Sequence, residues 1–79
     1  MNRQSKIESI AVKLKHNIEV RESLREILSE KFNKGEQNST AYKKYQSQFD
    51  RADRNEMNLR WELGEMDARL TKAGVLEIY

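Results

Sequence analysis

Residues 33–40, NKGEQNST, form the only stretch of this chain in which helix-forming sequence plainly stops. Gly and Asn adopt turn conformations easily, and Asn, Ser and Thr side chains compete with helical hydrogen bonds. The sequence on either side lacks Pro and is rich in residues that form helices well. This stretch therefore separates two helices, and the architecture depends on whether the chain reverses there.

Capping residues set the limits of the first predicted helix, which spans residues 6–33. Ser5 and Glu8 have the spacing of a capping box, in which each side chain satisfies a free amide of the first turn. At the other end, Gly35 can take the left-handed conformation that commonly follows a helix. We therefore expect a turn over residues 34–39.

The second predicted helix spans residues 40–73. Ser39 can cap its first turn, and Lys72 with Gly74 repeats the signal for a helix end. Residues 74–79 then form a short, apolar tail, for which we expect few partners within the chain. The sequence predicts a single helical-hairpin domain of the all-α class.

The apolar residues of the two helices predict an antiparallel, coiled-coil-like pairing. In a chain that reverses, the residue numbers of facing positions must add up to a constant. Five apolar pairs meet this condition: Leu28 with Tyr45, Leu24 with Phe49, Leu14 with Leu59, Ile10 with Leu63, and Ile7 with Met66. Two unrelated helices would rarely match in this way, so NKGEQNST is interpreted as the turn of the hairpin.

Polar residues interrupt both apolar stripes at the same level. Asn17 falls opposite Glu56, and Arg21 lies one turn away, where it can reach Glu56. Such a structural polar layer fixes the register at some cost in stability, because slipped pairings would leave its charges unpaired. A second interpretation, which the sequence leaves open, is a buried Arg21–Glu56 ion pair that serves as a switch.

Composition limits the classes of function. The chain has 79 residues, of which 37% are hydrophobic and 35% charged, and it has no Cys and no Pro. Disulfides and thiolate metal sites are thereby excluded, and no apolar run is long enough for a transmembrane helix. The absence of a signal-peptide pattern favours a cytoplasmic protein. The net charge is only +2.

One helical partner cannot cover all the apolar residues, which predicts a further protein contact. The first possibility is self-association of two hairpins into a four-helix bundle, with a homodimer expected. The second is docking onto a different protein, as an assembly subunit, adaptor, chaperone or inhibitor. Both would use the broad face of the first helix, the back of the second helix and the tail: Ala11, Ile18, Val20, Ile27, Phe32, Met57, Trp61, Leu76, Ile78 and Tyr79.

The sequence gives no sign of catalysis. His16 is the only histidine, and it has no carboxylate at helical contact spacing. No phosphate-binding loop, nucleophile motif or metal motif occurs, so we expect no enzyme, no cofactor and no metal site. Basic residues gather at the start of the first helix (Arg3, Lys6, Lys13 and Lys15), which leaves a weakly basic nucleic-acid-associated regulator as an alternative.

Two families of small helical hairpins share features with residues 41–50, AYKKYQSQFD. The stretch resembles the second-helix start of the small sporulation-phosphorelay aspartyl-phosphate phosphatases. Their Ser-x-x-Leu-Asp signature corresponds here to residues 46–50, with Gln46 in place of Ser, so phosphatase activity is not implied. The stretch is also similar to type III secretion needle subunits and their co-chaperones. That resemblance implies a component of a secretion-type assembly, although the turn here lacks the usual proline.

Overall fold

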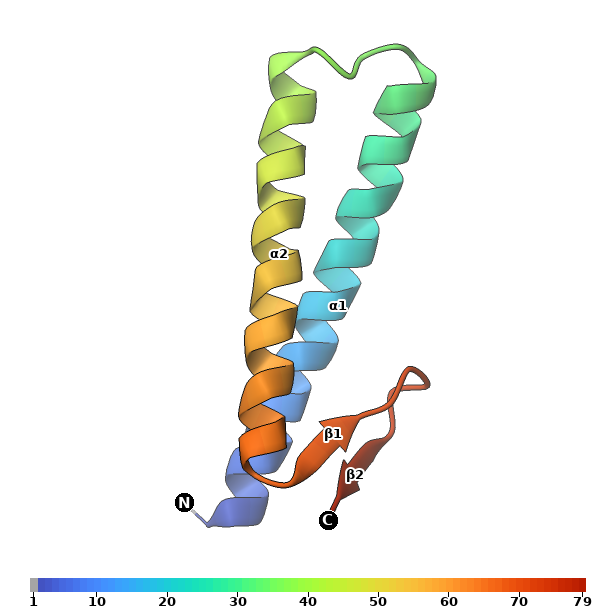
Figure 1. The fold of residues 1–79 in the computed structure, drawn as a ribbon. Coiled ribbons are helices and arrows are strands. Elements are labelled where there is room, and N and C mark those ends of the chain that lie inside the picture. Colours follow the sequence, from blue (N-terminus) through green and yellow to red (C-terminus); the bar gives the residue numbers. More distant parts are fainter. Residues whose placement is uncertain (1) are drawn as a thin grey trace.

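The computed structural model describes residues 2–79 as two long helices followed by a short β-hairpin (Figure 1). Helix α1 spans Arg3–Asn33 and helix α2 spans Thr40–Glu65. The two run side by side in opposite directions, in a molecule of 48 × 20 × 16 Å. The predicted helical hairpin is confirmed. The all-α class is wrong in one respect, because a small antiparallel sheet follows the helices.

The turn has the capping geometry that the sequence predicts. Gly35 has φ +75°, its amide donates to the carbonyl of Phe32, and the amide of Glu36 donates to that of Lys31. These two bonds form the motif that closes a helix with a left-handed residue. At the start of α2, the hydroxyl of Ser39 accepts a hydrogen bond of 3.1 Å from the amide of Tyr42.

The start of α1 differs from the prediction by three residues. Asn2 caps the helix, with its side-chain oxygen accepting a hydrogen bond of 2.8 Å from the amide of Ser5. Asn is at least as good an N-cap as Ser, so the helix gains a turn before the predicted capping box.

The C-terminal end of α2 is the main correction to the predicted fold. The helix stops at Glu65 rather than at residue 73, because Asp67 turns the backbone into the left-handed region with φ 57°. Asp tolerates this conformation better than most residues. The predicted helix end and tail form instead a β-hairpin of strands β1 (Ala68–Leu70) and β2 (Leu76–Ile78).

The β-hairpin is closed by a three-residue loop. The amide of Gly74 donates to the carbonyl of Thr71 at 3.0 Å, and the amide of Thr71 donates to that of Val75 at 2.9 Å. Gly74 has φ +84°, which is the conformation that such loops require at their last position. Gly74 is thus a turn residue of the hairpin rather than a helix stop.

The core lies at the base of the molecule, which we define as the end away from the turn. Three side chains there are fully buried, namely Ile7, Leu14 and Leu63. The β-hairpin adds Ala68 and Leu70 to the same cluster. Each large aliphatic side chain contributes about 1.5–3 kcal/mol when it is removed from water. The base is therefore the most strongly packed part of the chain.

Candidate functional site

A polar layer joins the two helices near mid-length. The Arg21 guanidinium donates to both carboxylate oxygens of Glu56, and the bond from Nη1 to Oε2 is 2.6 Å long. Only 10% of the Glu56 side chain and 17% of the Arg21 side chain are exposed. Asn17 donates from Nδ2 to the carbonyl of Ala52 at 2.7 Å. The three residues of the expected polar layer thus bridge the helices, and the role of the layer in register remains a prediction.

The electrostatics of Arg21 keep it charged. Burial lowers the pKa of Arg21, but the hydrogen bond that Arg21 donates to Glu22 and the negative charges of Glu56 and Glu22 outweigh it, so that the pKa lies above its ordinary value. The Nε atom of Arg21 is buried and has no hydrogen-bond partner among residues 2–79. An arginine fixed in its charged form neither gives up nor takes up a proton near neutral pH. Arg21 therefore acts as a fixed positive charge in the layer.

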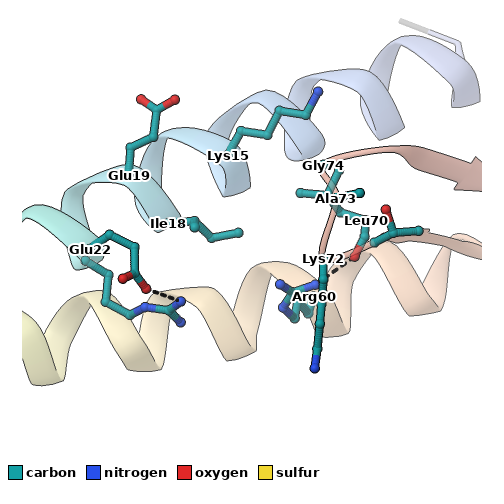
Figure 2. Close-up of a pocket in the computed structure, with 11 residues that line it drawn as sticks. Lys15, Ile18, Glu19, Glu22, Arg60, Leu70, Lys72, Ala73 and Gly74 are labelled. Atoms are coloured by element: carbon teal, nitrogen blue, oxygen red, sulfur yellow. Dashed lines mark hydrogen bonds and ion pairs between the residues drawn. The ribbon is translucent and has the colours of Figure 1, made fainter. Parts of the chain in front are cut away.

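A cavity of about 540 Å³ lies between α1 and the loop of the β-hairpin (Figure 2). Ile18 points into this space, towards Leu70. The carboxylate of Glu19 and the ammonium group of Lys72, which also line the cavity, point in opposite directions. These two charges do not converge on one point, as the charges of a catalytic pair would.

The β-hairpin covers part of the face that the sequence predicts to be free for docking. Ala11 is buried, and both Ile18 and Leu76 pack against the core cluster. These three predicted contact residues are therefore occupied within the chain. They were predicted to contact a partner because residues 74–79 were expected to form a tail with few partners within the chain.

The opposite side of the helical pair is open. A groove of about 220 Å³, which we call the open groove, runs between α1 and α2. Val20 in this groove is 39% exposed, and Leu24 forms part of the floor. Ile27, seven residues after Val20 on the same side of α1, is half-buried. The groove is lined by Asn17, Val20, Leu24, Gln48, Arg51, Ala52 and Asn55.

Two more apolar patches are exposed on the helices. Met57 and Trp61 lie one turn apart on α2 and are 66% and 67% exposed. Near the turn, Phe32 is exposed beside a hollow that Tyr42 and Phe49 also line. These three predicted contact residues (Met57, Trp61 and Phe32) are thus accessible in the structure.

The outer face of the β-hairpin carries a small polar network. Arg69 donates to Glu77 at 3.2 Å, and the Tyr79 hydroxyl donates to the other oxygen of the same carboxylate at 2.9 Å. The hydrogen bonds from Tyr79 and Arg69 lower the pKa of Glu77, and the bond to Glu77 raises that of Tyr79. Tyr79 and Ile78 remain exposed. They are accessible for a contact, as the sequence predicts, but on a sheet rather than a tail.

Sequence analysis missed the α2 wall of the open groove. Gln48, Arg51 and Asn55 are polar and were assigned to no surface, since the search followed apolar residues only. Helical spacing could have found them, because Gln48 and Asn55 lie seven residues apart and so share one side of α2. It also missed Val12, which is 66% exposed on α1.

The described residues show no cluster that could hold a metal ion, and His16 is exposed. Neither helix within residues 2–79 combines the length and the apolar content that a bilayer crossing requires. Comparisons with protein-family models, with curated proteins and with solved structures give no match. The surface itself is therefore the only guide to function.

Proposed function

We propose that this chain is a non-enzymatic protein-interaction module that binds through a helical face. The observation that carries the proposal is the open groove, whose lining comes from α1 and α2 alone and includes the exposed Val20. On the other side of the same helices, the β-hairpin fills the corresponding position with Leu70 and Leu76. An apolar strip between two helices is a common docking site for a third helix.

The small size of the chain is consistent with an assembly subunit, adaptor, chaperone or inhibitor. A second copy that docks groove to groove would complete a four-helix bundle, and a different protein could occupy the same face. Met57 and Trp61 would provide a further contact, because large exposed side chains often anchor interfaces. A cytoplasmic location belongs to the same proposal, and the absence of Cys is compatible with it.

The test compares two substitutions of the same type on one helix. Val20→Asp places a charge in the open groove, whereas Val12→Asp changes a more exposed valine that does not line it. The wild type and both variants are used to capture proteins from a lysate of the cells that encode the chain. Light scattering over a concentration series gives the solution mass of each.

We expect the wild type and Val12→Asp to capture a protein from the lysate or to form a dimer. Val20→Asp should no longer do so. Both variants should keep the helical circular dichroism of the wild type, since neither valine is buried. A monomeric wild type whose captured proteins do not depend on Val20 would contradict the proposed docking face.

A further inference from the structure

The open groove has basic side chains along both walls. On α1, Lys13 lies seven residues before Val20, and Lys6 lies seven residues before Lys13. On α2, Lys44 lies seven residues before Arg51, which itself lines the groove. Residues seven apart share one side of a helix, so Lys6 and Lys13 lie on the groove side of α1 and Lys44 on the groove side of α2, while Arg51 is the base that lines the groove itself. One acidic residue, Glu62, lies on the same side of α2, since it follows the lining residue Asn55 by seven residues.

These bases have no acidic partners within residues 2–79. All four are exposed, and none forms an ion pair there: Lys6, Lys13, Lys44 and Arg51. The opposite side of the helices has charges of both signs, since the residues that line its cavity include the acids Glu19 and Glu22 among the bases. Glu22 there contacts both Arg21 and Arg25. Helical spacing therefore places four exposed bases and one acid, Glu62, on the side of the groove.

This arrangement disfavours a second copy as the occupant of the groove. A two-fold dimer places the same patch of both subunits face to face. Two open grooves would then bring two sets of unpaired lysine and arginine side chains together, and like charges across an interface oppose association. A partner with acidic side chains would instead meet complementary charge on both walls.

We propose that the open groove binds an amphipathic helix of a different protein, with aliphatic residues along one face and acidic residues on its flanks. The inference rests on the proposed docking function and adds the chemistry of the partner. Val20, Leu24 and Ile27 provide the apolar strip for its aliphatic face. Lys6 and Lys13 continue the row of Val20 and Ile27 towards the base, and Lys44 and Arg51 lie on α2 across the groove.

The floor of the groove favours a helix over a nucleic acid. A nucleic-acid surface usually pairs basic side chains with aromatic rings that stack on bases. The residues that line the groove include no aromatic side chain, and three of them (Val20, Leu24 and Ala52) are aliphatic. Phe49, the aromatic residue nearest in sequence, is half-buried beside Arg25, whose guanidinium lies 5.9 Å from the ring centre.

The experiment measures the binding of two designed peptides to the full chain. Each peptide has three heptads. Both have Leu at the a and d positions, and one has Glu at every e and g position where the other has Lys. Like charges at these positions keep each peptide from pairing with itself. Binding is followed by fluorescence anisotropy of the labelled peptide, and backbone amide shifts of the protein locate the site.

We expect the Glu peptide to bind at the open groove and the Lys peptide to show no binding. The affinity should fall roughly tenfold or more between about 0.05 M and about 0.5 M salt, because exposed charges are screened. Lys13→Glu combined with Arg51→Glu should also weaken binding roughly tenfold. The matched control, Lys15→Glu with Lys72→Glu, reverses two exposed charges on the other side and should leave affinity unchanged.

Several results would overturn the inference. These are equal binding of both peptides, shifts confined to residues outside the groove, or no binding of the Glu peptide up to about 1 mM. Tighter binding of a mixed-sequence DNA duplex or single-stranded RNA, lost in the Lys13/Arg51 variant, would make the groove a nucleic-acid surface. A dimer lost on Val20→Asp would assign it to a second copy. A natural partner that needs Val20 but ignores charge reversal would preserve the proposed function and reject only this inference.

Discussion

The base of the molecule and the end near the turn are built from the same two helices, yet they are packed very differently. At the base, Ile7, Leu14 and Leu63 have no exposed surface. Near the turn, the larger side chains of Tyr45 and Phe49 are only half-buried. The difference is the β-hairpin, which adds a third layer at the base and is absent from the turn end (Figure 1). Without a third layer, the two helices leave these larger side chains partly exposed.

The turn end compensates in part with its charged residues. The Arg25 guanidinium lies 5.9 Å from the ring centre of Phe49, and Lys31 lies similarly over Tyr45. The aliphatic stems of these side chains cover apolar surface while their charges remain in water. Such contacts contribute about 0.5–1 kcal/mol at exposed sites. They stabilise the turn end less than a buried aliphatic residue stabilises the base.

The largest effect is expected when one leucine at each end of the molecule is replaced by alanine. Leu14→Ala should lower the free energy of unfolding by about 3 kcal/mol, because it leaves a cavity in the enclosed core. Leu28→Ala, at a half-buried position of the same helix, should cost about 1 kcal/mol. Urea unfolding followed by far-UV circular dichroism measures both. Equal losses would show that the ends are equally packed. Leu14→Asp, which buries a charge, should unfold the chain.

An intermediate effect is expected at the polar layer between the two ends. Glu56→Ala leaves the Arg21 guanidinium in the interface without its carboxylate, and should cost about 2–3 kcal/mol. Replacing both residues, with Arg21→Met and Glu56→Leu, should recover part of this loss. If the layer fixes the register, the double variant should also show extra amide signals from slipped pairings in its NMR spectrum. A single set of signals would assign the layer no role in register.

The smallest effect is expected from pH, and it acts only at the base. Glu77 has a pKa below the ordinary 4.5 in the folded hairpin, because Tyr79 and Arg69 stabilise its carboxylate. The ionised form therefore stabilises the hairpin above pH 4.5, and this contribution is lost as the pH falls through the lowered pKa.

Amide and Hα shifts of Arg69 should then move towards unstructured values as the pH falls below 4.5 through the lowered pKa of Glu77. Far-UV circular dichroism, dominated by the helices, should change little over that range. Glu77→Gln is the control, since it keeps the side-chain shape without the titrating group. If Arg69 shows the same pH dependence in this variant, another group is responsible.

The helical hairpin could be predicted from local signals because each of them acts over a few residues. Gly35 and Ser39 mark the turn by their own backbone and side-chain chemistry, and both have the predicted roles. The contact between Arg21 and Glu56 follows from helical spacing once the chain reverses. The β-hairpin was missed because helical spacing was extended through Leu70. The shorter pattern, with Ala68 and Leu70 buried and Arg69 exposed, alternates as a strand does.

The candidate site was less predictable than the fold. Val20, Ile27, Met57 and Trp61 were identified from their spacing, and none of them is fully buried in the structure. Ala11, Ile18 and Leu76 have the same apolar character, but the β-hairpin and the core use them internally. No local property separates these two groups. They differ only in which side of the helical pair the last residues of the chain cover.

The sequence by itself determined the two helices, the turn between them and the charged residues that lie at the level of the polar layer. These features depend on backbone conformation and on spacing along a helix, both of which are local. Only the tertiary structure decided which long side of the helices is covered and which remains an open groove. That outcome depends on where residues 66–79, which follow α2, find apolar surface. An apolar stripe attracts any apolar partner without specifying one, because the hydrophobic effect is not directional.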